Sequence, residues 1–233
     1  MREITFALVS ELYEDHLDDL RVVRKEQREL YVDHRQAGGK AQLDDLEAEI
    51  TYLLLRAARP RNVVEIGCLH GWSTSWILRA LRDNGRGTLH SFDRVDAATR
   101  RVPPELSVDR WRFTHGDVRI RLREFPDAID YLFVDAAHTS RFARWYVRTV
   151  LPTLAPGTPV SVHDVHHRAN PLPFSEGRVL LEWLGARGHS SFTTAAAKSP
   201  TVCRELERRR TNWGLAEPIH TGRDNPMVFF TSA

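Results

Sequence analysis

Several features that mark membrane, secreted or nucleic-acid-binding proteins are missing or scarce in this sequence. No hydrophobic run approaches the ~20 apolar residues that span a bilayer, and the first residues lack the apolar core of a signal peptide. The two cysteines, Cys68 and Cys203, do not make a disulfide framework. Lys+Arg 33 against Asp+Glu 31 leaves a formal charge of +2, whereas a dedicated nucleic-acid binder carries a larger, clustered basic excess. We therefore expect a cytoplasmic protein that has neither a membrane nor a nucleic acid as its partner.

The 233 residues, 42% of them hydrophobic, suffice for one large domain with a sizeable core. Residues 1–58 predict helices, because apolar residues recur at helical spacing on both sides of a break at residues 36–40. Most of the charge in this N-terminal helical segment is explained by a solvated helix face. A lid or dimer arm, through which a homo-oligomer could form, is the second interpretation.

From residue 59 to residue 233, short apolar strands alternate with helices, a pattern typical of βαβ units and a parallel sheet. We therefore predict an α/β fold, a doubly wound, mostly parallel seven-stranded sheet with an N-terminal helical appendage. The expected strands cover residues 62–66, 87–93, 111–114, 129–135, 158–163, 191–193 and 227–230.

The turn after the first expected strand has the features of a ligand-binding loop. It has the spacing E-x-G-x-x-x-G from Glu65 through Gly67 to Gly71, and the two glycines allow a tight turn and close approach to a ligand. Ser73 stands at the start of the next helix, where it can cap the helix or bond a ligand carboxylate. The spacing differs from the G-x-G-x-x-G of dinucleotide binders, which disfavours hydride-transfer enzymes.

Acidic residues end the next two expected strands, at the edge where ligands bind in open α/β sheets. Asp93 is placed to bond a ribose diol, and Asp117 to accept from an adenine amino group. Together with the Glu65–Gly71 loop, these features resemble the S-adenosylmethionine site of the class I methyltransferases over residues 60–233. The resemblance implies a Rossmann-like methyltransferase fold for residues 59–233 and S-adenosylmethionine as the cofactor. The cofactor-binding residues that it implies are Glu65, Gly67, Gly71, Ser73, Asp93, Asp117 and Asp135.

A second constellation follows the fourth and fifth expected strands. Asp135 and Asp164 would lie at the same rim of the sheet and would repel each other unless a proton or a cation lies between them. The pattern Asp135-x-x-His138, followed by His163-Asp164 and by the closing segment 225–230, resembles a metal-dependent branch of the family. That branch holds small-molecule O-methyltransferases similar to macrolide sugar O-methyltransferases and cephalosporin-hydroxylase-like proteins. The resemblance implies that Asp135 and Asp164 ligate magnesium and that His138 is the general base.

His163 departs from the sugar enzymes, which carry a carboxylate at that position. An imidazole matches magnesium less well, because magnesium prefers oxygen ligands. Manganese, iron or zinc are then alternatives, with Asp135, His163 and Asp164 as metal ligands. A structural His163 with no metal is the other interpretation. His138 suits a general base, since the unperturbed pKa of histidine is ~6.5, but it can also cap the helix that begins near residue 139.

We therefore predict an S-adenosylmethionine-dependent, divalent-metal-assisted O-methyltransferase that acts on a small hydroxylated molecule, a secondary metabolite. The alternative is a methyltransferase-like protein that uses the same cofactor pocket for a cyclase or isomerase step. A nucleic-acid methyltransferase is disfavoured by the small net charge and by the absence of an Asn/Asp-Pro-Pro-Tyr-like motif after the fourth expected strand.

Overall fold

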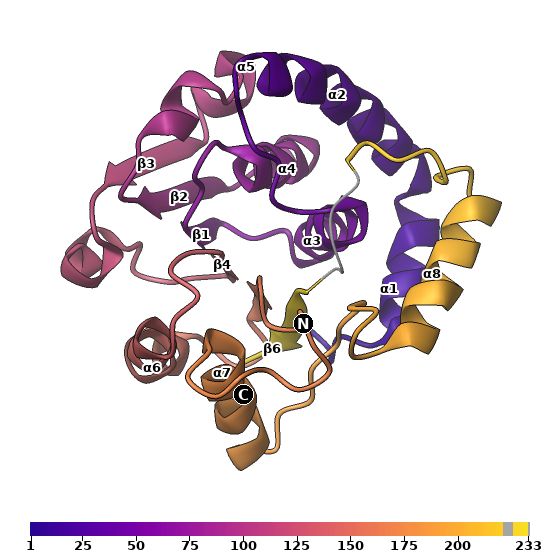
Figure 1. Cartoon of the computed structure of the whole chain (residues 1–233). Helices are drawn as coiled ribbons and strands as arrows, with labels where there is room; N and C mark the ends of the chain where they lie inside the picture. Colours follow the sequence, from indigo (N-terminus) through magenta and orange to yellow (C-terminus); the bar gives the residue numbers. More distant parts are fainter. Residues whose placement is uncertain (221–225, 233) are drawn as a thin grey trace.

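The computed structural model describes residues 1–220 and 226–232, which form a sheet with helices on both faces (Figure 1). Residue 225 of the closing segment lies outside the described residues. Among the described helices, none is both long enough and apolar enough to cross a membrane. The α-helices are α1 (Phe6–Asp15), α2 (Leu17–Gln36), α3 (Asp45–Ala58), α4 (Trp72–Asp83), α5 (Pro104–Ser107), α6 (Ser140–Thr149), α7 (Glu176–Ala186) and α8 (Pro200–Asn212). The strands are β1 (Asn62–Ile66), β2 (Thr88–Asp93), β3 (Trp111–His115), β4 (Tyr131–Val134), β5 (Pro159–Val162) and β6 (Val228–Thr231). Short 3-10 helices cover Ala97–Arg100, Val118–Ile120, Leu122–Glu124 and Leu151–Thr153.

The sheet has the strand order β3-β2-β1-β4-β5-β6. The first five strands are parallel, and only β6 runs antiparallel, against β5. The order reverses between β1 and β4, which pair from Val63 opposite Tyr131 to Ile66 opposite Val134. The predicted α/β class and the mostly parallel sheet are therefore confirmed, and the reversal marks where an open sheet of this kind binds its ligand.

The predicted number of seven strands is wrong, because the described residues form a six-stranded sheet. Residues 191–193 make only an isolated bridge, in which Phe192 and Phe229 exchange backbone hydrogen bonds of 2.7 and 2.8 Å. The hydroxyl of Thr193 donates to the Met227 carbonyl and accepts from the Ala195 backbone N–H. These two hydrogen bonds turn the chain at Thr193, so the pairing with β6 ends after Phe192.

Alternate residues of each strand face two different hydrophobic clusters, as the pleat of a strand requires. Val63 of β1 packs in a cluster with α1, α3, α4 and α8, whereas Val64 packs in a cluster with α6 and α7. In β4, Phe133 faces the first cluster and Val134 the second. Both faces of the sheet are thus covered, which is why its central strands are almost continuously apolar.

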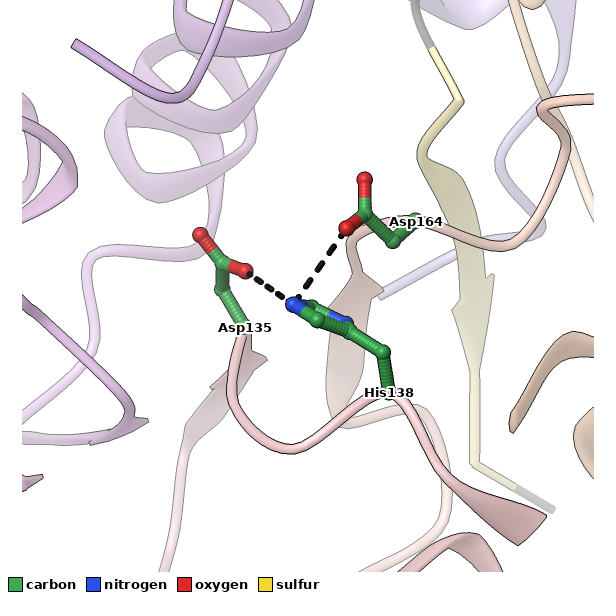
Figure 2. Close-up of side chains that lie close together, drawn as sticks. All are labelled: Asp135, His138 and Asp164. Carbon is green, nitrogen blue, oxygen red and sulfur yellow. Dashed lines mark ion pairs between the residues drawn. The ribbon is translucent and has the colours of Figure 1, made fainter. Parts of the chain in front are cut away.

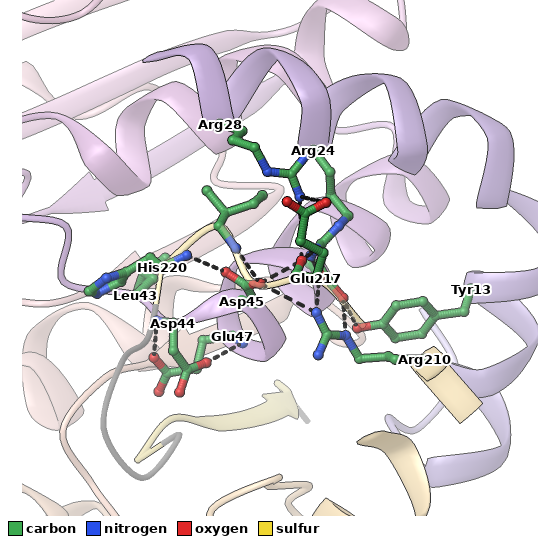
Figure 3. A network of polar contacts seen from close by, with 12 residues as sticks. Tyr13, Arg24, Arg28, Leu43, Asp44, Asp45, Glu47, Arg210, Glu217 and His220 are labelled. Atoms are coloured by element: carbon green, nitrogen blue, oxygen red, sulfur yellow. Dashed lines mark hydrogen bonds and ion pairs between the residues drawn. The ribbon is translucent and has the colours of Figure 1, made fainter. Parts of the chain in front are cut away.

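A buried network of charged side chains joins α1, α2, α3 and α8 (Figure 3). The Glu49 carboxylate, fully buried in α3, accepts hydrogen bonds from Tyr13 of α1 at 2.7 Å and from Arg210 of α8 at 2.8 Å, and it pairs with Arg24 of α2. Arg24 also donates to Asp45 at 3.2 Å. Removing one member of such a buried set leaves an uncompensated charge, so the network fixes α3 relative to its neighbours.

Candidate active site

A cavity of about 450 Å³ opens at the carboxyl ends of the parallel strands. Its walls are the loops after β1, β2, β3 and β4, together with the start of α6. The volume lies in the range of small-molecule sites. The predicted site residues that line the cavity are Gly67, Ser73, Asp93, Asp117, Asp135 and His138.

Gly67 brings the loop after β1 against the loop after β4. Its φ of +87° lies in the left-handed region, and a Cβ built there would stand 1.8 Å from the backbone oxygen of Asp135. Only glycine allows this approach. Gly71, also with a positive φ, begins α4, where a Cβ would meet Val102 at 2.5 Å. The E-x-G-x-x-x-G spacing therefore serves close packing of two loops as well as a tight turn.

Glu65 lies beneath this loop, outside the set of described residues that line the cavity. Its carboxylate, 0% exposed, accepts hydrogen bonds from Ser73 at 2.7 Å, Thr74 at 2.9 Å and Ser91 at 2.5 Å. Burial raises the pKa of Glu65 to about 7, although the three hydroxyls oppose that shift. Glu65 thus holds the β1–α4 loop in place, and Ser73, which faces both Glu65 and the cavity, connects the two.

Asp93 and Asp117 line the cavity at the carboxyl ends of β2 and β3. One oxygen of Asp93 accepts from the backbone N–H groups of Cys68 and Leu69, both at 2.7 Å. Asp117 caps the following 3-10 helix and pairs with Arg119 at 2.5 Å. Hydrogen bonding from Arg119 lowers the pKa of Asp117 to about 2. The carboxylate of Asp117 therefore reaches the cavity wall in its ionised form.

Asp135, His138 and Asp164 converge beyond the carboxyl ends of β4 and β5 (Figure 2). The Nε2 atom of His138 lies 3.4 Å from Oδ1 of Asp135 and 3.3 Å from Oδ2 of Asp164. One ligand atom from each of the three residues lies within 4.8 Å of the others, a spacing that suits a metal ion. His138 and Asp164 both have positive φ angles, 45° and 57°. Such strain, of order 1–3 kcal/mol per residue, is typical of functional sites.

His163 lies on the inner side of this cluster and is 5% exposed. Its Nδ1 atom is 3.3 Å from Asp135 and 3.1 Å from Asp164, and its Nε2 atom is 3.3 Å from Glu47. At these distances the charged groups form ion pairs. Within the part of the chain that the structure describes, neither ring nitrogen of His163 makes a hydrogen bond. The structure thus brings the predicted metal residues Asp135, His163 and Asp164 together, and it adds His138 to them.

The carboxylates of this cluster favour the protonated forms of the two imidazoles. Burial lowers the pKa of His138, but the hydrogen bond with Glu176 and the charges of Asp135 and Asp164 outweigh burial and raise it. The pKa of His163 is raised well above its usual value, because the charges of Asp135 and Glu47 outweigh burial. A divalent cation would balance the same carboxylates. The available carboxylate oxygens and imidazole nitrogens fit manganese, iron or zinc better than magnesium.

Two residues of the site, Glu47 and Glu176, were not predicted from the sequence. Glu47 is the third residue of α3 and shares a capping box with Asp44. Glu176 is the first residue of α7, directly after the cap residue Ser175. Acids at these positions are common because they complete caps and favour the helix dipole. The sequence signal of each therefore indicates a helix start, and only the fold shows that both carboxylates face a histidine.

Comparisons with known proteins find methyltransferases. A model of a methyltransferase domain matches residues 64–165. A catechol O-methyltransferase from Niastella koreensis is 28% identical over 119 residues, which are 46% of this chain and 52% of that protein. The chain thus spans about half the length of that relative.

Two crystal structures share the fold. The O-methyltransferase from Bacillus cereus in complex with SAH matches with a TM-score of 0.61 at 17% identity, covering 89% of this chain and 91% of that one. The O-methyltransferase TomG from Streptomyces achromogenes, in complex with SAM, matches with a TM-score of 0.59 at 18% identity, covering 91% and 90%. The matched domain and the strand order confirm the resemblance to the class I S-adenosylmethionine-dependent methyltransferases over residues 64–165, and the two crystal structures share the fold.

Proposed function

We propose that this protein is an O-methyltransferase that methylates a small hydroxylated molecule with the assistance of a divalent metal. The observation that carries the proposal is the cluster of Asp135, His138 and Asp164, of which Asp135 and His138 line the cavity. Two carboxylates and an imidazole at the edge of a cofactor pocket suit the deprotonation of a hydroxyl group. The relative from Niastella koreensis is described as a catechol O-methyltransferase, which supports a hydroxylated acceptor.

The cofactor would lie along the cavity from Asp117 to Asp135. Asp93 would bond the ribose hydroxyls and Asp117 the adenine amino group, since carboxylates accept from both. Gly67 leaves room for the methionine part, next to Ser73. Glu65 and Gly71 would contribute by holding the loop rather than by touching the cofactor.

The residues of the metal cluster would divide the remaining work. When bound, S-adenosylmethionine supplies a sulfonium methyl group, and a divalent cation supplies Lewis-acid polarisation of the acceptor hydroxyl. Asp135 and Asp164, with His163 beside them, would hold the cation. His138 loses its proton more readily once the charges of these carboxylates are balanced. Its Nε2 atom can then accept the hydroxyl proton as the acceptor oxygen takes the methyl group.

Several predictions from the sequence belong to this proposal. They are the division into an N-terminal helical segment (1–58) and a cofactor-binding domain (59–233), a homo-oligomer through the N-terminal helices, and a cytoplasmic location. A role in secondary metabolism is supported by TomG, which is described as involved in tomaymycin synthesis.

The test is a turnover assay with S-adenosylmethionine and a panel of catechols and sugar diols, with and without a metal chelator. The proposal predicts methylated product and S-adenosylhomocysteine in equal amounts, activity lost with the chelator, and activity restored by manganese or magnesium. Conversion of an acceptor without S-adenosylhomocysteine would contradict it and would favour a cyclase or isomerase. Full activity in the chelator would remove the metal from the proposal.

A further inference from the structure

The two histidines of the metal cluster are arranged alike. In each ring, the inner nitrogen faces Asp135 and Asp164. The outer nitrogen faces a buried glutamate at the start of a helix, α7 for His138 and α3 for His163. Both glutamates are 1% exposed. Because a carboxylate only accepts hydrogen bonds, each can fix the N–H on the outer nitrogen of its ring.

Glu176 contacts His138 from the start of α7. Its Oε2 atom lies 3.2 Å from Nδ1 of His138 in a hydrogen bond, while Nε2 of the same ring faces the two aspartates. The cap of α7 is made by Ser175, which accepts from the Arg178 backbone N–H. The other oxygen of Glu176 is buried without a hydrogen-bond partner in the part of the chain that is described. The helix cap therefore does not explain why this carboxylate is buried beside His138.

Glu47 contacts His163 from the start of α3. Its Oε2 atom lies 3.3 Å from Nε2 of His163, whose Nδ1 atom faces Asp135 and Asp164. Its Oε1 atom accepts from the Met227 backbone N–H at 2.9 Å, which fixes the carboxylate against β6. The buried network around Glu49, two residues further along the same helix, holds α3 in place. The N-terminal helices thus deliver a carboxylate to the inner edge of the metal cluster.

We propose that Glu176 and Glu47 are positioning residues: each holds the outer N–H of its histidine, so that the inner nitrogen, Nε2 of His138 or Nδ1 of His163, is the one that offers a lone pair when a cation balances Asp135 and Asp164. This inference rests on the proposed metal-assisted function and adds residues from α3 and α7 to it. Behind His163, which faces the cation, a carboxylate typically raises metal affinity 10–100-fold. Behind His138, the carboxylate of Glu176 would instead present Nε2 as an acceptor toward the substrate side.

The first test uses the metal-free protein with ¹⁵N-labelled histidine. Imidazole N–H protons that face a buried carboxylate resonate downfield and exchange slowly, so His138 should give such a proton on Nδ1 and His163 one on Nε2. Glu176→Gln should shift or remove only the first, and Glu47→Gln only the second, because a neutral amide accepts more weakly or donates instead. Absence of both signals from the wild-type protein would overturn the proposal, whether or not a metal binds.

The second test measures manganese and zinc affinity by calorimetry. Glu47→Gln should weaken binding 10–100-fold, because His163 faces the cation, whereas Glu176→Gln, which acts on the base His138, should not. Both variants should keep the S-adenosylhomocysteine affinity of the wild type. The matched controls are Ser175→Ala and Asp44→Ala, which remove the side-chain caps of the same two helices. The controls should bind metal as the wild type does. Equal losses of metal affinity in Asp44→Ala and Glu47→Gln would mean that helix stability, and not the carboxylate, controls the site.

The two tests separate this inference from the proposed function. Protected imidazole protons in a wild-type protein that binds no metal would support the positioning role and refute the metal. Metal binding that Glu47→Gln does not weaken would refute the positioning role of Glu47 and leave the metal in place.

Discussion

The buried carboxyl group of Glu65 makes the stability of the protein depend on pH. Its pKa is about 7 in the folded protein, against 4.5 for an ordinary glutamate. Because the folded-state pKa is the higher one, the folded protein binds this proton more tightly than the unfolded chain. Its contribution to stability is complete below pH 4.5 and is lost as the pH rises to 7. A difference of 2.5 pKa units corresponds to roughly 3 kcal/mol.

The perturbation is Glu65→Gln, which keeps the shape of the side chain but removes its titration. Urea unfolding of both proteins between pH 4.5 and pH 8 gives the free energy of unfolding of each. The wild-type protein should lose roughly 3 kcal/mol relative to the variant over this range. Titration of other groups cancels in the difference. The exposed Glu217→Gln serves as the control and should run parallel to the wild type. Equal pH profiles for wild type and Glu65→Gln would refute the reasoning.

Three further substitutions test other parts of the account. Gly67→Ala should destabilise the protein by about 2–4 kcal/mol in thermal unfolding, from left-handed strain plus the clash with Asp135, and an unchanged melting temperature would contradict it. Arg210→Ala removes a cation that balances the buried charge of Glu49, so it should lower the free energy of unfolding in urea by about 3–5 kcal/mol. A loss below 1 kcal/mol would show that the network is not needed for stability. His138→Gln should lower kcat about 10²–10⁴-fold while S-adenosylhomocysteine affinity is kept, and an unchanged kcat would exclude it as the base.

Much of the fold was predictable because its strands are short, apolar and regularly spaced. The strand ends at Asp93 and Asp135 were predictable for the same reason, since Asp93 is the last residue of β2 and Asp135 directly follows β4. The bridge at Phe192 was overpredicted as a strand, because three residues of strand-like composition do not reveal that Thr193 turns the chain.

The positions of Glu47 and Glu176 could not be predicted from the sequence, because they depend on tertiary packing. Glu47 precedes His163 by more than a hundred residues, and the two meet only where α3 packs near β5. In the sequence, α6 and β5 separate Glu176 from His138. The Glu176 carboxylate reaches the His138 ring only because α7 packs against α6. Local patterns identify both as helix-start acids, and the contacts that give them a further role are long-range.

The most direct test of the central claim is a calorimetric titration of metal-stripped protein, first with S-adenosylhomocysteine and then with manganese or zinc. The account predicts one site for S-adenosylhomocysteine and a separate metal site, with the metal heat lost in Asp164→Ala and the S-adenosylhomocysteine heat retained. Failure of S-adenosylhomocysteine to bind under any metal condition would contradict the claim that this cavity is a cofactor site.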